Sequence, residues 1–336
     1  MTAGTHPTLD WSSLQAPLAR RFQAVELLPF SGRVHDQAAC QRGIDRLSSA
    51  LPVMGLDRLQ QDHQRFAAPD ESRQAWLDNM GQTKDSLLLG VRGGYGITRL
   101  LDNAPLLDIA KRMTENRCVL TGHSDFTALQ LALLSAALQA RAPIPLMLQG
   151  PMLCIDWGLD SAIERTFTDF NRVLEGLGHV PPKPLTITDT LESVPKSYQT
   201  SIPPHGMLWG GNLSMLCALL GTPHFPDIDG GILFIEDVNE HPYRIERMLL
   251  QLHQAGVLNK QRALLVGECS DWKPSPLDNG YDLTVALEHI ASVAQISIFT
   301  GLRFGHIADR LTLPVGQHKE LGPASNGQVR LDIVPA

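Results

Sequence analysis

The sequence predicts an α/β protein whose N-terminal part is a mostly parallel sheet flanked by helices, followed by a smaller C-terminal α/β domain. Short apolar runs alternate with longer segments in which apolar residues recur at helical spacing. This alternation is typical of β-α-β units, which build parallel sheets. A proline-rich stretch separates two such series. We therefore expect an N-terminal domain at residues 1–175, a crossover at 176–205 and a C-terminal domain at 206–336.

The first half supplies the strands and helices of the N-terminal domain. The run at 87–91 (LLLGV) is wholly apolar, as expected for a parallel strand buried on both faces. Asp70 is expected to cap the polar helix that follows it. The segment 126–140 is almost free of charge and is expected to be a buried helix. The expected strands are 24–28, 87–91, 117–122 and 145–150, and the expected helices are 35–51, 71–82 and 126–140.

The second half begins with six prolines in the 176–205 segment, which argue against regular structure there and favour a crossover. Helical periodicity returns in YRIERMLLQLHQAG, which ends at Gly256 as a C-terminal cap. Two apolar runs, GILFIED and RALLVGEC, are typical of strands. The expected elements are a helix at 211–221, a strand at 231–237, a helix at 243–256 and a strand at 262–269.

Composition excludes several classes of protein. The 336 residues include 35 acidic and 28 basic ones, and the formal net charge of -7 argues against general nucleic-acid binding. The five cysteines are odd in number and none are paired at metal-clip spacing, so neither a disulfide framework nor a zinc ribbon is expected. The N-terminus lacks the apolar core of a signal peptide, and the longest mostly apolar stretch, 131–140, is too short to span a membrane. We expect a cytoplasmic protein.

A serine lies at a predicted strand-to-helix turn, in the string Gly122-His123-Ser124-Asp125. On such a turn the hydroxyl of Ser124 is exposed above the sheet, and the next backbone amide points to where an oxyanion would form. Only half of the hydrolase elbow pattern is present, because Phe126 stands where that pattern has glycine. The alternative is that Ser124 or Asp125 only caps the helix.

The glycine-rich string RGGYG (92–96) follows the strand at 87–91. Its glycines allow the backbone to approach a ligand closely and to present free N–H groups to an anion. The spacing matches neither a dinucleotide fingerprint nor a P-loop. A tight structural turn is the alternative. Both this loop and Ser124 are expected at the carboxyl ends of parallel strands, where open α/β sheets bind their ligands.

Two further groups come from the second half. Glu236 and Asp237 end a strongly apolar strand, where one carboxylate could orient an imidazole. His306 lies in a loop framed by glycines. The order Ser124, Glu236, His306 is the order of the triad in α/β-hydrolases, although order alone is only suggestive.

Six strings carry a family resemblance, and they run in family order from about residue 24 to 320. They are RGGYG (92–96), GHSDFTAL (122–129), GPM (150–152), WGGNLSML (209–216), GILFIEDVNEHPYRIERML (231–249) and FGH with LTLPVG (304–316). With these strings the chain resembles the serine LD-carboxypeptidases, which include muramoyltetrapeptide carboxypeptidases and microcin C immunity peptidases. Two departures stand out: His123 replaces a bulky apolar residue, and Gln149 stands where a histidine often precedes Gly-Pro.

The resemblance assigns roles to residues of this chain. It implies that Ser124 is the nucleophile, Glu236 the acid of the triad and His306 the base. It also implies an oxyanion hole from the backbone amides of Gly94 and Asp125. The implied N-terminal fold is similar to that of glutamine amidotransferases, and a homodimer is expected. Serine chemistry needs no cofactor, and the histidines lack the paired spacing with carboxylates that would indicate a metal site.

The implied reaction is hydrolysis of the L,D-peptide bond before the terminal D-Ala of murein tetrapeptides, a step in peptidoglycan recycling. Arg92 or Arg303 is expected to bind the free carboxylate of the substrate. The alternative is that either arginine pairs with Asp237 or Glu240.

Three other functions remain open to comparison. An immunity peptidase that cleaves aminoacyl-nucleotide conjugates would offer an aromatic ring to the base, and Trp209 is available for this. A catalytically inactive sugar- or peptide-binding protein would not need serine, glutamate and histidine together. A glutamine amidotransferase relative would need a cysteine at position 124, where this chain has serine.

Overall fold

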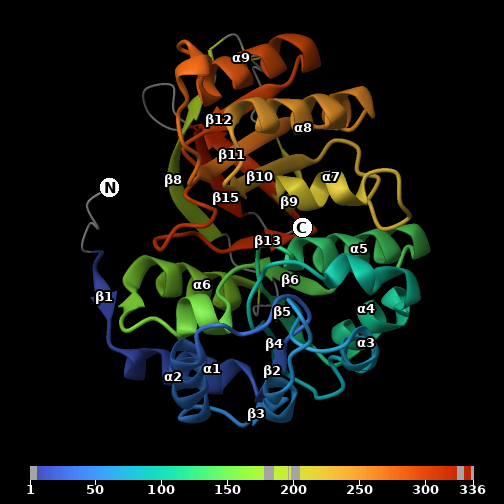
Figure 1. Cartoon of the computed structure of the whole chain (residues 1–336), viewed down its shortest axis with the longest axis vertical. Coiled ribbons are helices and arrows are strands. Elements are labelled where there is room, and N and C mark those ends of the chain that lie inside the picture. Colours follow the sequence, from blue (N-terminus) through green and yellow to red (C-terminus); the bar gives the residue numbers. More distant parts are fainter. Residues whose placement is uncertain (1–5, 178–184, 196, 198–204, 324–328, 334–336) are drawn as a thin grey trace. The chain divides into compact units, whose positions relative to one another are not determined.

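The computed structural model describes residues 6–177, 185–195, 197, 205–323 and 329–333 (Figure 1). The chain divides into two compact units, each with its own sheet and its own buried core. Unit 1 comprises residues 1–178, 221–226 and 311–314, and unit 2 comprises residues 179–220, 227–310 and 315–336.

Unit 1 is built on a six-stranded sheet in the order β13-β6-β5-β4-β2-β3. Its strands are β2 (Ala24–Leu28), β3 (Val53–Met54), β4 (Ser86–Gly90), β5 (Val119–Thr121), β6 (Leu146–Gln149) and β13 (Leu313–Val315). The pairs from β3 to β6 are all parallel. Every residue of β2 and β4 is buried, as a central parallel strand requires. The predicted mostly parallel sheet is confirmed.

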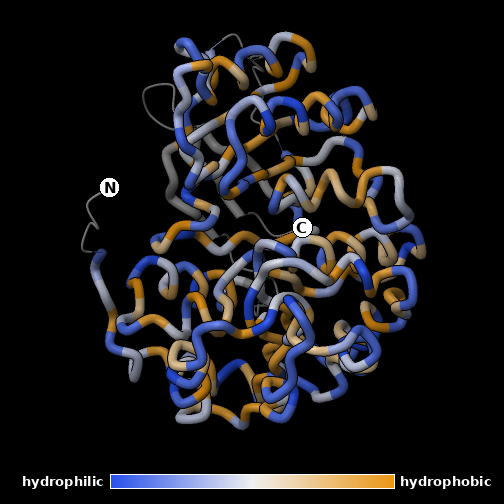
Figure 2. The backbone as a smooth tube through the Cα atoms, in the orientation of Figure 1, coloured by the Kyte–Doolittle hydropathy of each residue, from blue (hydrophilic) through white to orange (hydrophobic). Residues whose placement is uncertain are grey.

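Helices flank this sheet. They are α1 (Gln15–Arg21), α2 (Gln37–Ser48), α3 (Asp70–Asp78), α4 (Leu106–Glu115), α5 (Phe126–Ala140) and α6 (Glu164–Leu177). α5 has the predicted bounds, is mostly hydrophobic (Figure 2), and is buried over most of its residues. α4 is not among the predicted helices, although its buried residues Leu106, Ile109, Ala110 and Met113 recur at helical spacing.

The prediction that Asp70 caps α3 is wrong. Pro69 occupies the capping position, and Asp70 is the first residue of the helix. The Asp70 carboxylate pairs with Arg73 and Arg99 instead of a backbone N–H. The helix also ends at Asp78, earlier than the predicted residue 82.

Short elements complete unit 1 and the loops of both units. β1 (Thr8–Leu9) pairs antiparallel with β7 (Ala162–Ile163). The 3-10 turns are η1 (Trp11–Leu14), η2 (Leu56–Gln60), η3 (Ile97–Arg99), η4 (Leu101–Asn103), η6 (Leu258–Lys260) and η7 (Pro276–Asp278), and η5 (Leu153–Trp157) is a π-helical turn.

Unit 2 contains a closed barrel in the order β10-β11-β12-β8-β15-β14-β9. Its strands are β8 (Leu185–Ser193), β9 (His205–Asn212), β10 (Ile232–Val238), β11 (Ala263–Ser270), β12 (Ser297–Thr300), β14 (Gln317–Pro323) and β15 (Val329–Ile333). The run β9-β10-β11-β12 is parallel, whereas β8, β14 and β15 join it through antiparallel pairs. The accompanying helices are α7 (Leu213–Leu219), α8 (Pro242–Gln254) and α9 (Leu283–Ala294).

Two expectations about unit 2 need correction. Strand β8 lies inside the segment 176–205, where the prolines predicted a crossover. The prolines in fact flank a β-branched run, TITDT, that suits a strand. The predicted helix at 211–221 begins only at Leu213, because β9 continues to Asn212 and the Asn212 side chain caps α7. Gly256 follows α8 with φ of 76°, consistent with its predicted role in ending that helix.

No helix in the described part of the chain is both long enough and apolar enough to cross a membrane.

Candidate active site

Ser124 lies in unit 1 on the turn between β5 and α5, and its backbone is left-handed, with φ of 61°. A residue other than glycine in this conformation is strained by about 1–3 kcal/mol. No side chain makes a capping hydrogen bond at the start of α5. The capping alternative is therefore not supported, and the turn has the strained geometry of a nucleophile elbow.

The glycine-rich loop at 92–96 packs directly against this turn. A Cβ atom added to Gly93 would lie 2.8 Å from both Cβ and Oγ of Ser124, and 3.7 Å from the amide nitrogen of Asp125. The Gly93 carbonyl accepts a hydrogen bond from the Gly32 amide at 3.3 Å, which fixes the loop from its other side. Glycine is required at 93 because any side chain would displace the serine.

We expect Gly93→Ala to lower kcat by about 10²-fold, because a shift of about 1 Å at a reacting group costs that much. Gly93 does not have positive φ, so the substitution acts through contact with Ser124 rather than through backbone strain. Thermal unfolding supplies the check. The destabilisation caused by Gly93→Ala should be smaller in a Ser124→Gly background, which removes the clashing Cβ. Equal destabilisation in both backgrounds would contradict this contact.

Two backbone amides beside Ser124 are available to a ligand. Within the described residues, neither the Gly94 N–H nor the Asp125 N–H donates a hydrogen bond to the protein. Gly94 follows Gly93, whose α-carbon faces Ser124 so closely that an added Cβ would clash with the serine side chain. Unpaired N–H groups next to a serine hydroxyl are the donors that an oxyanion hole needs.

The Asp125 side chain holds this region together. Its carboxylate accepts a hydrogen bond from Ser31 Oγ at 2.7 Å and one from the Ile97 amide at 3.0 Å. Burial raises the pKa of Asp125 above its usual value, and the hydrogen bonds from Ser31 and Ile97 oppose that rise. Through Ser31 and Ile97, Asp125 therefore connects two segments to the serine turn: the loop after β2 and the end of the glycine-rich loop. Arg73, fully buried, adds bonds to the Phe30 and Gly96 carbonyls.

Gln149, one of the departures from the family pattern, is fully buried below the same turn. Its amide nitrogen donates to Thr127 Oγ1 at 3.0 Å and to Gln130 Oε1 at 2.9 Å. Gln130 in turn donates to the Gly122 carbonyl at 3.0 Å. Gln149 therefore supports the residues that precede and follow Ser124. His123, the other departure, is 1% exposed.

Glu236 and His306 lie together in unit 2. Glu236 lies near the end of β10 and is fully buried, and its Oε2 lies 2.7 Å from Nδ1 of His306. Burial lowers the pKa of His306, but the hydrogen bond that Glu236 accepts and the charge of that carboxylate raise the pKa by more, so the net pKa is above the usual value. A carboxylate on Nδ1 leaves Nε2 as the nitrogen that can exchange a proton with a reacting group.

The loop that carries His306 lies close to β11 at Gly267, which is not among the predicted site residues. A Cβ at Gly267 would lie 2.4 Å from the Phe304 carbonyl oxygen. That carbonyl accepts a hydrogen bond from the Glu268 amide at 2.8 Å, so the loop is bonded to β11 where the glycine gives it room. The signal in the sequence is a glycine inside an apolar strand, which often marks a close approach of backbone.

Asn212 was also missed as a site residue. It pairs with Glu236 across the parallel strands β9 and β10, and its Nδ2 donates to Glu236 Oε1 at 3.1 Å. The string WGGN before a helical segment is a signal for a helix cap, but nothing in it indicates a carboxylate partner.

The two candidate substrate arginines have different surroundings. Arg92, next to Gly93, donates to the Arg33 carbonyl at 2.7 Å and forms no ion pair with any residue in the described ranges. Arg303 in unit 2 lies 3.2 Å from the Asp309 carboxylate. The two carboxylates that were the alternative partners of these arginines bind other groups. Glu240 pairs with Arg244 at 2.6 Å, and Asp237 accepts from Asn212 Nδ2.

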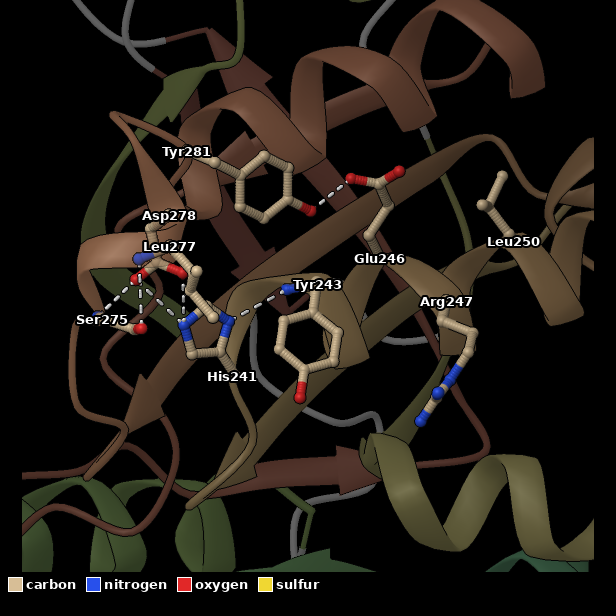
Figure 3. A pocket seen from close by; sticks show the side chains of 9 residues that line it. All are labelled: His241, Tyr243, Glu246, Arg247, Leu250, Ser275, Leu277, Asp278 and Tyr281. Atoms are coloured by element: carbon tan, nitrogen blue, oxygen red, sulfur yellow. Dashed lines mark hydrogen bonds and ion pairs between the residues drawn. The ribbon is translucent and has the colours of Figure 1, made fainter.

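A pocket of about 620 Å³ lies elsewhere in unit 2, between one face of α8 and the 275–281 loop (Figure 3). Its polar groups bond to one another: His241 Nε2 lies 3.2 Å from Asp278, and the Tyr281 hydroxyl donates to Glu246. None of the predicted site residues lines it. Over the described ranges, no group of His, Cys, Asp and Glu side chains is arranged to hold a metal ion.

Comparison with known proteins identifies relatives over most of the chain. Family models for the N-terminal and C-terminal domains of LD-carboxypeptidases match residues 25–140 and 205–321. A putative carboxypeptidase from Synechocystis is 31% identical over 306 residues, which cover 87% of this chain and 88% of the relative.

Solved structures with the same fold include a muramoyltetrapeptide carboxypeptidase from Oxalobacter formigenes. It is 36% identical, with a TM-score of 0.78, and the match covers 93% of this chain and 100% of that one. The structure of MccF in complex with glutamyl sulfamoyl guanosine is 18% identical, with a TM-score of 0.77 over 93% of this chain and 96% of that one. At that identity the likeness shows the fold alone.

Proposed function

The chain belongs to the LD-carboxypeptidase family, and we propose that it is a serine peptidase that removes the terminal D-Ala of murein tetrapeptides. The bond cleaved is the L,D-peptide bond between the diamino acid and D-Ala. The observation that supports this most strongly is the strained Ser124 turn, beside which the Gly94 and Asp125 N–H groups have no partner among the described residues. The Glu236–His306 hydrogen bond is a second support, because a carboxylate on Nδ1 prepares an imidazole to act as a base.

In this proposal Ser124 Oγ attacks the carbonyl carbon while Nε2 of His306 takes the hydroxyl proton. The N–H groups of Gly94 and Asp125 stabilise the oxyanion of the tetrahedral intermediate. Collapse of that intermediate breaks the C–N bond, and His306 gives its proton to the departing amine of D-Ala. Water then hydrolyses the acyl-enzyme with His306 again as base. Glu236 holds the ring and stabilises its protonated form.

Arg92 is the better candidate for the carboxylate of D-Ala, because it is beside the serine turn and has no ionic partner in the described ranges. We expect Arg92→Ala to raise KM at least about tenfold with a smaller change in kcat, as loss of a charge-assisted hydrogen bond predicts. Arg303→Ala is the matched control, and its effect on KM should be smaller. Steady-state kinetics of both variants decide the assignment, and an unchanged KM for Arg92→Ala would contradict it.

The proposed function carries expectations about the pathway, the cellular compartment and the oligomeric state of the protein. Release of D-Ala from a tetrapeptide is a step of peptidoglycan recycling, which would take place in the cytoplasm. A homodimer is expected from the family resemblance, and light scattering on the purified protein would test it.

The decisive experiment is mass spectrometry of a murein tetrapeptide after incubation with the purified enzyme. We expect loss of a single alanine from the tetrapeptide and no reaction with a matched peptide ending in L-Ala. An aminoacyl sulfamoyl nucleoside, the class of ligand named in the MccF structure, serves as the competing substrate. Cleavage of that compound, without cleavage of the tetrapeptide, would overturn the proposal in favour of an immunity peptidase.

A further inference from the structure

Glu236 and Asp237 are adjacent in β10, yet both are buried, with exposures of 0% and 3%. Neighbouring residues of a regular strand point to opposite faces. Here the register between β10 and β11 shifts between Ile235 and Asp237, so the strand is irregular at this point. The irregularity brings two carboxylates into one buried polar cluster, and only one of them contacts His306.

The second carboxylate is fully hydrogen-bonded by other groups. Asp237 Oδ1 accepts from Asn212 Nδ2 at 3.1 Å and from the Val238 amide at 2.8 Å. Asp237 Oδ2 accepts from the Ser214 amide and the Ser214 hydroxyl, both at 2.8 Å. A buried carboxylate with four donors is held in one orientation, because rotation would break all four bonds.

Asn212 connects the two carboxylates. Its Nδ2 group donates to both Glu236 Oε1 and Asp237 Oδ1, each at 3.1 Å. Its Oδ1 accepts from the Met215 amide at 3.2 Å, at the start of α7. These contacts fix which end of the amide faces Glu236, since a flipped amide would point its oxygen at two carboxylates.

We propose that Asp237 is a positioning residue, which acts through Asn212 to hold Glu236 with its free oxygen facing His306. The inference rests on the proposed function, since it assigns Glu236 and His306 to catalysis. It gives the adjacent carboxylates separate tasks: Glu236 orients the imidazole, and Asp237 orients the amide that orients Glu236.

The hydrogen bonds of Asp237 require a carboxylate at this position, with an acceptor on both sides. Each of its oxygens faces a backbone N–H donor, from Val238 on one side and from Ser214 on the other. An asparagine at 237 has the same shape but one NH₂ group, which would face a fixed N–H in either orientation. Asp237→Asn should therefore disturb the cluster, although it changes neither the volume nor the backbone.

The test combines a measurement that needs no substrate with one that does. Proton NMR of the wild type should show a downfield resonance from the His306 Nδ1–H bonded to Glu236, absent in His306→Gln. We expect Asp237→Asn and Asn212→Ala to lose this resonance, and kcat to fall by about 10²-fold with little change in KM. Ser214→Ala removes only one of the four donors and should keep the resonance, with kcat within about threefold.

The two readouts separate the inference from the proposed function. A resonance that is lost in Asp237→Asn supports the positioning role even if no tetrapeptide is cleaved. A resonance and kcat that both survive in Asp237→Asn overturn it, as does a wild type that lacks the resonance. Thermal unfolding shows whether each variant is folded, and if Asp237→Asn is not, Asn212→Ala decides by the same criteria.

Discussion

Replacing Ser124 by alanine is expected to lower kcat for D-Ala release by about 10⁶-fold, the loss seen when the nucleophile of a serine peptidase is removed. Without the hydroxyl, the amides of Gly94 and Asp125 remain but no acyl-enzyme can form. The stability of the protein should change little, because no side-chain capping bond forms at the start of α5 and alanine keeps the strain of φ at 61°. Mass spectrometry of the tetrapeptide and thermal unfolding measure the two effects.

Ser275 provides a matched control, since it is a serine that does cap a helical turn. Its hydroxyl accepts from the Leu277 amide as part of a capping box with Asp278. Ser275→Ala should cost about 1 kcal/mol of stability and leave kcat unchanged, the reverse of the effect at Ser124. Cleavage by Ser124→Ala at the rate of the wild type would mean that the nucleophile is another residue.

Local periodicity was sufficient to predict much of the fold. The strand Ala24–Leu28 and the helix Phe126–Ala140 have the predicted bounds, because apolar runs and uncharged helical segments are signals contained in a few consecutive residues. The closed barrel was not predicted. Its closure depends on the pairs β8–β12, β8–β15 and β9–β14, which join segments distant in the sequence, and periodicity does not specify the partner of a strand.

The difference between local signals and contacts of distant segments also applies to the candidate site. Ser124 follows a strand and precedes a helix, so its turn could be predicted from neighbouring residues. The contact of Asn212 with Glu236 joins residues that are 24 positions apart, and that of Gly267 with Phe304 joins a strand to a distant loop. Such contacts exist only in the folded chain. The sequence therefore supports a proposal for the reacting residues from local signals, but it does not indicate which residues hold them in place.

Replacing Glu236 by glutamine is expected to lower kcat by about 10⁴-fold, as removal of the acid does in a serine triad. The amide is the same size, so Asn212 can still contact the side chain, but the negative charge beside His306 Nδ1 is lost. The imidazolium that forms during acylation then has no counter-charge at 2.7 Å. Steady-state kinetics on the tetrapeptide measure the loss, and unchanged kinetics would remove Glu236 from the mechanism.

The pH dependence gives this variant a second, independent signature. His306 must be neutral to act as a base, so activity falls as the pH drops through its pKa. In the wild type, burial lowers this pKa but the hydrogen bond and charge of Glu236 raise it more, so the acid limb should lie above the ordinary value of about 6.5. In Glu236→Gln the hydrogen bond to the carboxylate and its charge no longer raise the pKa of His306, while burial still lowers it. The acid limb should therefore move to lower pH. Profiles of kcat/KM for both proteins measure the displacement. If the acid limb of the kcat/KM profile lies at the same pH in both proteins, the titrating group is not the imidazole bonded to Glu236.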